Sequence, residues 1–217
     1  MAERFADRED AGLALAGKLG EFRGQAGLIV LGLPRGGVPV ASVVARSLNA
    51  PLDVIVVRKI GVPGQAEVAM GAIASIAGSI VTVQNPSVLR QLGGVRFQPI
   101  FDERAARERE ELERRQREYR AGRAPLDVAG KTVILVDDGI ATGATMRAAI
   151  MALRPAGAER MVVAVPVAAA DTCAELAKLV DSVVCVSKPE PFWAVGQAYI
   201  DFSQTSDEEV RRLLGSD

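Results

Sequence analysis

Runs of apolar residues recur along the chain and alternate with stretches of helical composition. Within the runs the apolar positions are continuous, which is typical of strands buried on both faces of a parallel sheet. The predicted strands span 28–33, 52–59, 132–137, 161–167 and 182–187, and the predicted helices span about 38–48, 143–154 and 170–179. This order predicts an α/β fold, a parallel sheet with helices on both faces.

Residues 68–83 interrupt this alternation. The run is apolar but is punctuated by Ala and Gly, notably at Ala77 and Gly78. The pattern favours an antiparallel hairpin over a crossover helix. We expect such a hairpin to form a flap that can cover a site.

Charge density rises sharply between residues 101 and 123. Glu and Arg recur there at spacings of three and four residues, which stabilises an exposed helix. We therefore expect a helical insertion at about 99–124 that has almost no apolar face and connects two parts of the core. A lid, a dimer arm and a nucleic-acid contact are the alternatives, and the acids interleaved with each Arg weaken the last of these.

The composition fits a single domain over residues 1–217. The chain is 49% hydrophobic and 4% aromatic, which suits a core of Val, Ala, Leu and Ile. With 26 basic and 27 acidic residues the net charge is −1, so no global field attracts nucleic acid or an anionic membrane. We find no signal-peptide pattern and no membrane-spanning run, and expect a cytoplasmic protein.

The absence of histidine narrows the chemistry. It excludes Ser-His-Asp and Cys-His catalysis, His-ligated zinc and an imidazole base. Carboxylates, Lys, Arg, backbone groups and Mg2+ remain. Cys173 and Cys185 have no metal-binding or redox spacing, and we expect two buried structural thiols.

An acidic pair and a Gly/Thr loop follow the most apolar run. Asp137 and Asp138 should emerge at the carboxyl end of a buried strand, where ligands of parallel sheets collect. The loop opens directly into a helix, whose free N–H groups and dipole favour a phosphate. The acids can accept from ribose hydroxyls or hold Mg2+. The predicted phosphate-binding residues are Ala141, Thr142, Gly143, Ala144 and Thr145.

A second candidate anion site follows the first predicted strand. Pro34, Arg35, Gly36 and Gly37 form a tight turn that opens a helix. The two glycines present amide hydrogens and Arg35 adds a forked cation.

The segment 133–146, VILVDDGIATGATM, resembles the 5-phosphoribosyl-1-pyrophosphate (PRPP) motif of type I phosphoribosyltransferases. The strand, acidic pair, TG-x-T and helix occur in the family's order. A receiver domain also has an acidic pair, but it needs a further Asp after a later strand, and MVVAVPV supplies none. The resemblance implies the family's Rossmann-like fold and Mg2+-dependent transfer of the 5-phosphoribosyl group with release of pyrophosphate. It also implies that residues 34–37 bind pyrophosphate, in a loop that often carries a cis peptide.

Arg58 and Lys59 end the second predicted strand, at the same sheet edge as Asp137. They are similar to the RK-x-G-x-PG run of adenine phosphoribosyltransferases, which precedes a mobile loop. The resemblance implies that both cations neutralise the departing pyrophosphate and that residues 60–72 close over the site. Glu67 is the carboxylate of that loop, so we list it as a candidate for proton handling.

The C-terminal segment at about 188–202 is similar to the hood of hypoxanthine-type enzymes. The resemblance implies that Trp193, or else Phe192, stacks on a planar base and that Asp201 approaches Mg2+ or pyrophosphate. The spacing from Gly196 to Asp201 is one residue longer than in that pattern. As an alternative, these aromatics seal the open edge of the core.

Ala141 limits the choice of acceptor. Hypoxanthine-type enzymes have an Asp at this place, whereas adenine-type loops carry Ala. An ordinary 6-oxopurine enzyme is therefore disfavoured, and we expect salvage of some nitrogenous base. The main alternative is a PRPP-binding regulator without efficient transfer, and a third is a structural role centred on the charged helix. A homodimer is the usual expectation for such a chain.

Overall fold

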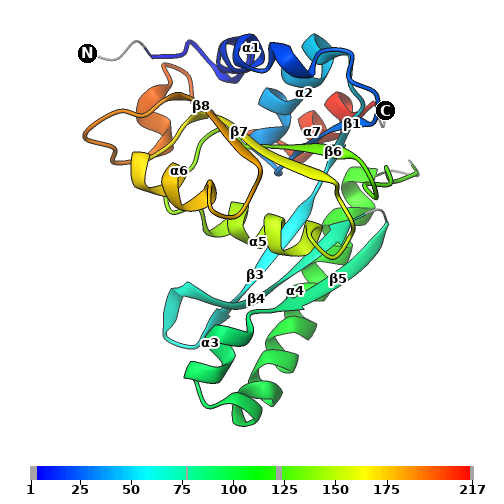
Figure 1. The fold of residues 1–217 in the computed structure, drawn as a ribbon, viewed down its shortest axis with the longest axis vertical. Coiled ribbons are helices and arrows are strands. Elements are labelled where there is room, and N and C mark those ends of the chain that lie inside the picture. The colour runs from blue at the N-terminus through cyan, green and yellow to red at the C-terminus, as the bar shows by residue number, and fades with distance from the viewer. Residues whose placement is uncertain (1–3, 77, 121–123, 216–217) are drawn as a thin grey trace.

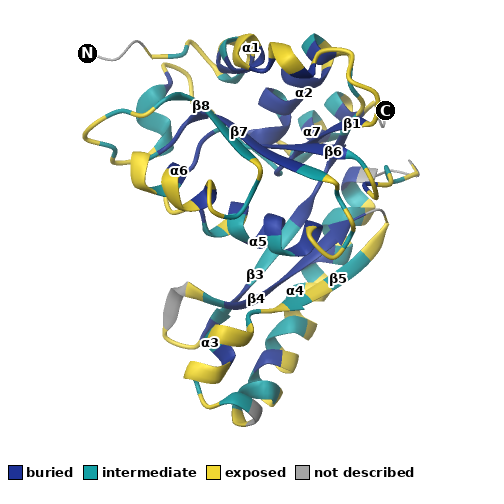
Figure 2. Cartoon of the chain, viewed as in Figure 1, coloured by how far each residue is buried: buried dark blue, intermediate teal, exposed yellow. Residues whose placement is uncertain are grey.

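A five-stranded parallel sheet forms the centre of the computed structural model, which describes residues 4–76, 78–120 and 124–215 (Figure 1). In spatial order its strands are β2 (Leu52–Val54), β1 (Leu28–Gly32), β6 (Thr132–Val136), β7 (Arg160–Val167) and β8 (Ser182–Ser187). Every residue of β1 and β6 is buried, and so is β7 except for its first residue, whereas β8 is half-buried throughout; Figure 2 shows the central strands in dark blue. The continuous apolar runs therefore form buried parallel strands, as predicted.

Helices cover both faces of this sheet, which confirms the predicted fold class. In Figure 1, α1 (Arg8–Lys18), α2 (Gly37–Leu48) and α7 (Asp207–Leu214) lie above the sheet, and α5 (Ala144–Leu153) and α6 (Ala170–Leu176) lie below it. The strand pleat separates the two layers. Val30 and Ile134 pack towards α1 and α2, whereas Ile29 and Val133 pack towards α5.

The predicted strand 52–59 is wrong as a single element. It breaks at Ile55 into β2 and β3 (Val56–Val62), and β3 belongs to a different sheet. The buried carboxylate of Asp53 accepts the N–H groups of Val54 at 2.8 Å and Leu126 at 3.1 Å. These bonds fix the end of β2 where the chain leaves the central sheet. Arg58 and Lys59 therefore do not lie at the edge that carries Asp137, contrary to the prediction.

A three-stranded antiparallel sheet is built from β3, β4 (Gln65–Ile76) and β5 (Ser79–Gln84). The predicted hairpin is confirmed, since β4 and β5 pair from Gly71 and Gln84 to Ile76 and Ser79, although Ala77 lies outside the described residues. Residues 60–72 are not an irregular loop. They form most of the β3–β4 hairpin, whose turn includes Gly64 with a φ of 75°.

The charged segment forms helix α4 (Gln98–Arg120), preceded by α3 (Pro86–Gln91) and the 3-10 turn η2 (Gly94–Phe97). The expectation that α4 has almost no apolar face is wrong. Phe101, Leu112 and Tyr119 are at most 2% exposed and pack on the antiparallel sheet. Ala105 adds to this stripe, so α4 is the second layer of a small subcore.

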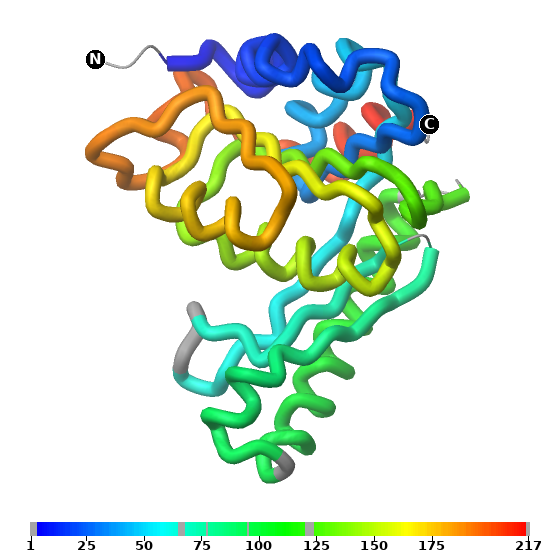
Figure 3. The backbone as a smooth tube through the Cα atoms, in the orientation of Figure 1, coloured from blue at the N-terminus to red at the C-terminus, as the bar shows by residue number. Residues whose placement is uncertain are grey.

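The N-terminal and C-terminal segments lie side by side over the carboxyl edge of the central sheet (Figure 3). Phe5 pairs with Tyr199 as a parallel bridge, close to the short turn η3 (Val195–Ala198). Asp7 is the N-cap of helix α1, and its carboxylate accepts the N–H groups of Glu9 and Asp10. A 3-10 turn, η1 (Gly20–Phe22), follows the helix.

Two smaller predictions are also answered. Cys173 is buried and Cys185 is half-buried, and both thiols are free, with Sγ of Cys185 donating to the carbonyl of Ser187. Among the described helices none is both long enough and apolar enough to cross a membrane.

Candidate active site

The acidic pair lies at the carboxyl end of β6, as predicted. Asp137 and Asp138 are both half-buried, and the N–H of Asp138 donates to Oδ1 of Asp137 at 2.9 Å. Burial, together with the charge of Asp138, raises the pKa of Asp137 well above its ordinary value. Burial also raises the pKa of Asp138, although the guanidinium of Arg8 opposes that shift. The pair thus concentrates negative charge in a poorly solvated position.

The glycine turn after β1 packs directly against this pair. A methyl group at Gly36 would lie 2.0 Å from Oδ2 of Asp138, and one at Gly37 would lie 2.7 Å from the carbonyl oxygen of Val136. Only glycine fits such a close approach, so the two adjacent glycines of the sequence are explained by the contact of this turn with the end of β6. The peptide between Pro34 and Arg35 is cis. The structure therefore brings together two motifs that are separated by about a hundred residues of sequence.

The Thr/Gly loop forms a small cavity beside the acidic pair. Gly143 has a φ of 71° and precedes the first residue of α5, so the amides of Ala144 and Thr145 belong to a helix N-terminus. The cavity has a volume of about 130 Å³ and is lined by Asp137 and residues 139–146. Its size and donors suit one phosphate group.

Arg147, in the first turn of α5, contacts this loop and was not predicted from the sequence. Its guanidinium donates to the carbonyl of Thr142 and lies 3.2 Å from Glu175 of α6. On the other side, the hydroxyl of Thr172 donates to the carbonyl of Ala141 at 2.8 Å. The carbonyls of Ala141 and Thr142 are therefore both hydrogen-bonded to side chains outside the loop, and the N–H of Ala144 donates to Oγ1 of Thr142 at 3.4 Å, so the loop is held from three directions.

Arg8 is a second residue that sequence reasoning missed. From the first turn of α1 its Nε donates to Oδ2 of Asp138 at 2.9 Å, and Nη1 donates to the carbonyl of Ser203 at 2.6 Å. Its guanidinium also lies 4.2 Å from the centroid of the Phe202 ring. One arginine thus connects the N-terminal helix, the acidic pair and the C-terminal segment. A lone Arg in an ordinary helix carries no sequence signal for that role.

Arg35 is held from the side of α7. Its Nη1 lies 3.8 Å from Oδ2 of Asp207, whose Oδ1 accepts the hydroxyl of Tyr119 at 2.7 Å. Burial and this carboxylate raise the pKa of Tyr119. The predicted anion-binding cation is therefore oriented by the first residue of α7 and the last turn of α4.

Arg58 and Lys59 line a second, larger cavity of about 640 Å³. Thr145 of the phosphate loop lines the same cavity, so this part of the antiparallel sheet adjoins the phosphate loop. Nε of Arg58 donates to Oε2 of Glu108 on α4 at 2.6 Å. The side chain of Glu67, a candidate for proton handling, lies outside the described residues.

The C-terminal hood rests on the glycine that follows the acidic pair. A methyl group at Gly139 would lie 2.4 Å from the Val195 side chain, and the buried Tyr199 donates its hydroxyl to the carbonyl of Asp138. The two predicted stacking residues differ. Trp193 is 83% exposed, whereas Phe192 is half-buried and packs on the cluster around Tyr199.

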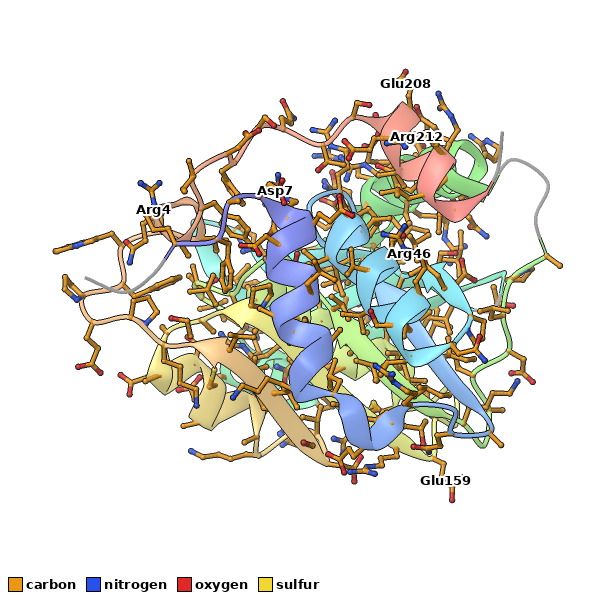
Figure 4. All side chains as sticks on the ribbon, turned by 90° about the horizontal axis from the view of Figure 1, so that it is seen from above. Arg4, Asp7, Arg46, Glu159, Glu208 and Arg212 are labelled. Atoms are coloured by element: carbon orange, nitrogen blue, oxygen red, sulfur yellow. The ribbon has the colours of Figure 1, made fainter. Side chains whose placement is uncertain are left out.

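Asp201, predicted to approach Mg2+ or pyrophosphate, lines the same cavity as Arg8. Its carboxylate accepts the N–H of Ser203 at 2.9 Å, and the cavity has a volume of about 340 Å³ and lies between α1, α2 and α7. Figure 4 labels Asp7, Arg46 and Arg212, which line the same cavity. Within the described residues no group of three or more His, Cys, Asp or Glu side chains is arranged to hold a metal ion.

The phosphoribosyltransferase fold is defined by these features together. A parallel sheet carries an acidic pair, with a glycine turn on one side of the pair and a Thr/Gly loop on the other, and a small antiparallel sheet is joined to it. The profile described as "Phosphoribosyl transferase domain" matches residues 12–203. The chain belongs to this family.

Relatives agree with this assignment. The structure described as TT1426 from Thermus thermophilus is 44% identical, with a TM-score of 0.87 and 97% of each chain covered. Two Mycobacterium tuberculosis proteins, "Putative phosphoribosyl transferase MT0597" and "Putative phosphoribosyl transferase Rv0571c", are each 48% identical over 210 residues. That match covers 97% of this chain and 46% of each relative, so the chain spans about half their length.

Proposed function

We propose that the chain transfers the 5-phosphoribosyl group of PRPP to a nitrogenous base and releases pyrophosphate. The observation that carries this proposal is the packing of Gly36 and Gly37 against Asp138 and Asp137. It puts the predicted pyrophosphate loop and the predicted ribose site in contact. The activity of the longer relatives as whole proteins is a separate question.

The Thr/Gly loop binds the 5-phosphate in this proposal. Residues Ala141 to Thr145 line the cavity of about 130 Å³, and the α5 N-terminus adds its dipole. Asp137 borders the same cavity, so the ribose would lie beside the acidic pair. The two carboxylates would accept the ribose hydroxyls and favour positive charge on the ring in the transition state.

The leaving pyrophosphate would lie between the glycine turn and the cations. Arg35 supplies a guanidinium beside Gly36, and Lys59 and Arg58 face the site from β3. The donor set fits Mg2+, which is usually bound through one or two carboxylates together with substrate phosphates. Asp137 and Asp138 would hold the ion, whose charge would offset that of pyrophosphate. Asp201 accepts from Ser203, and its approach to Mg2+ or pyrophosphate stays a prediction.

The reaction exchanges one bond at the anomeric carbon. A bond forms from a ring nitrogen of the base to C1 of the ribose, while the C1–O bond breaks and its electron pair leaves with pyrophosphate. The proton on the attacking nitrogen passes to a proton-accepting side chain, for which Glu67 is the candidate. Trp193, or else Phe192, would stack on the ring and orient it.

The experiment is a pyrophosphate-release screen of the protein with PRPP and Mg2+ against purines, pyrimidines, orotate and other nitrogen nucleophiles. A Mg2+-dependent thermal shift with PRPP is measured first. We expect Asp138→Asn and Thr145→Val to lose most turnover and exposed Glu159→Gln to retain it. Normal turnover by Asp138→Asn would reject the assignment, and no thermal shift at all would favour a structural role.

One observation favours the alternative, a PRPP-binding regulator. Arg8 occupies Oδ2 of Asp138, one of the oxygens proposed for the ribose. PRPP must compete with that ion pair, which would lower turnover. Binding of PRPP without pyrophosphate release from any acceptor would identify the chain as such a regulator.

A further inference from the structure

Trp193, the proposed stacking residue, lies in the loop that joins β8 to η3. Residues 188–194 form neither a helix nor a strand. The indole is 83% exposed, and within the described part of the chain it makes no hydrogen bond and no aromatic contact. Packing therefore does not fix the ring, so its position depends on the backbone of this loop.

One side chain, that of Gln197 in η3, holds this backbone. Its Oε1 accepts the N–H of Trp193 at 2.9 Å and the N–H of Ala194 at 3.4 Å. Its Nε2 donates to the carbonyl of Pro191 at 3.0 Å. A single carboxamide thus bonds to three backbone groups of the loop, which needs both an acceptor and a donor on one side chain. Gln197 therefore closes residues 191–197 into a turn that carries Trp193.

The turn η3 is itself anchored beside the acidic pair. A methyl group at Gly139 would lie 2.4 Å from Cγ1 of Val195, so these two residues are in close contact. Gly139 directly follows Asp138, and Gln197 lies two positions after Val195. The carboxamide of Gln197 therefore links the loop of Trp193 to the end of β6.

We propose that Gln197 is a positioning residue for the acceptor, which holds Trp193 in place for stacking on the base beside the acidic pair. This inference rests on the proposed transferase function and on the stacking role given there to Trp193. Gln197 acts through the loop, because its carboxamide is bonded to backbone groups. A loop that is ordered before the base arrives loses less conformational entropy on binding. Loss of the three bonds should weaken acceptor binding and leave PRPP binding unchanged.

The order of the loop is tested first, without any ligand. Trp193 is the only tryptophan in the sequence, so its time-resolved fluorescence anisotropy reports on this loop alone. We expect Gln197→Ala to increase the amplitude of nanosecond depolarisation without changing the midpoint of urea unfolding. Gln197→Glu should be intermediate, because a carboxylate still accepts the two N–H groups but cannot donate to Pro191. Gln204→Ala, exposed on the same C-terminal segment, is the matched control and should behave as wild type.

A double-mutant cycle then tests the consequence for the reaction. With an acceptor found by pyrophosphate release, Gln197→Ala should raise KM for that acceptor roughly fivefold, because the loop must then be ordered on binding. The kcat and the affinity for PRPP should not change. In a Trp193→Ala background the same substitution should change KM little, because the residue that it positions is already absent. Gln197→Glu should recover part of the loss.

Other results overturn the inference in distinguishable ways. Unchanged anisotropy in Gln197→Ala would show that other contacts order the loop. Greater mobility with an unchanged acceptor KM, or an equal rise in KM with and without Trp193, would reject the positioning role. Weaker PRPP binding by Gln197→Ala would assign the loop to the donor and reject that role as well. Failure of the wild type to release pyrophosphate with any acceptor would instead reject the proposed function itself, whatever the anisotropy shows.

Discussion

The guanidinium of Arg8 lies on the carboxylate of Asp138, although 130 positions separate the two residues in the sequence. Nη2 of Arg8 is 2.8 Å from Oδ2, and the two side chains are only 12% and 13% exposed. Partial burial makes this ion pair stronger than a surface pair, and it also makes a lone partner costly. The N-terminal helix is thereby attached to the centre of the candidate active site.

Replacement of Arg8 by Met should therefore destabilise the fold. The change leaves a poorly solvated carboxylate without its cation, which costs about 2–4 kcal/mol. The free energy of unfolding in urea measures this loss. Arg8→Met with Asp138→Asn should recover part of it, and exposed Lys18→Met on the same helix should change little. Equal stability of Arg8→Met and wild type would show that the ion pair contributes nothing.

The contact between the glycine turn and the acidic pair gives a second prediction. In Gly36→Ala the new methyl group would lie 2.0 Å from Oδ2 of Asp138, so the turn or the carboxylate must move. We expect at least a tenfold loss of PRPP affinity, measured by calorimetry. Gly17→Ala is the control, since a methyl group there meets nothing within 4 Å. Unchanged PRPP affinity in Gly36→Ala would separate this turn from the PRPP site.

The sequence pattern was sufficient to predict those parts of the fold and site that depend on neighbouring residues in the chain. Continuous apolar runs marked the buried strands, and the order of strand, acids, Thr/Gly loop and helix marked the acidic pair and the loop up to Thr145. The break at Ile55 could not be seen, because apolar residues continue through it while the chain moves to another sheet. Arg8 could not be seen either, because its partner is set by tertiary folding alone.

The inner face of α4 shows a different limit. Its stripe recurs at spacings of three and four residues, and two of the positions are charged. Glu108 pairs with Arg58 and Arg115 with Glu111, so these charges are compatible with an inward position. In the sequence alone the ion-pair partners of these two residues are not visible, so the amphipathic pattern of the helix is not recognised. The residues of the stripe are Phe101, Ala105, Glu108, Leu112, Arg115 and Tyr119.

A third prediction tests that stripe. Leu112 is 0% exposed, and Leu112→Ala should lower the free energy of unfolding by about 2–5 kcal/mol. Leu13 is 58% exposed on α1, and Leu13→Ala should change it by less than about 0.5 kcal/mol. Denaturant unfolding measures both. A Leu112→Ala protein as stable as Leu13→Ala would mean that α4 is the solvated connector expected from its composition.

The raised pKa of Asp137 predicts opposite trends of stability and activity with pH. Burial and Asp138 raise this pKa in the folded state, so the native protein binds the proton more tightly than the unfolded chain does. The resulting stability is complete below the unfolded pKa, about 3.9, and is lost as pH rises through the folded pKa. Activity needs the ionised form and should fall on acidification, with its acid limb above that of an ordinary Asp.

Asp137→Asn isolates this group. At pH 8 the variant should be more stable than wild type, because it removes a poorly solvated charge, and each 1 kcal/mol raises Tm by roughly 2–4 °C. The difference should shrink as pH falls towards 4, while turnover is absent throughout. Thermal unfolding of both proteins across this range provides the measurement. A constant difference in Tm would show that Asp137 titrates normally.

The two aromatics of the hood should separate stability from acceptor binding. Phe192 packs on Tyr199 and its neighbours, so Phe192→Ala should cost about 2 kcal/mol of folding free energy. Trp193 is 83% exposed, so Trp193→Ala should leave stability within about 0.5 kcal/mol of wild type. If Trp193 stacks on the base, this variant raises KM for the acceptor several-fold and leaves PRPP affinity unchanged. Trp193 is the only tryptophan in the sequence, so its fluorescence reports the contact directly. An emission that does not respond to an acceptor that is turned over would assign the stacking role to Phe192 or to neither residue.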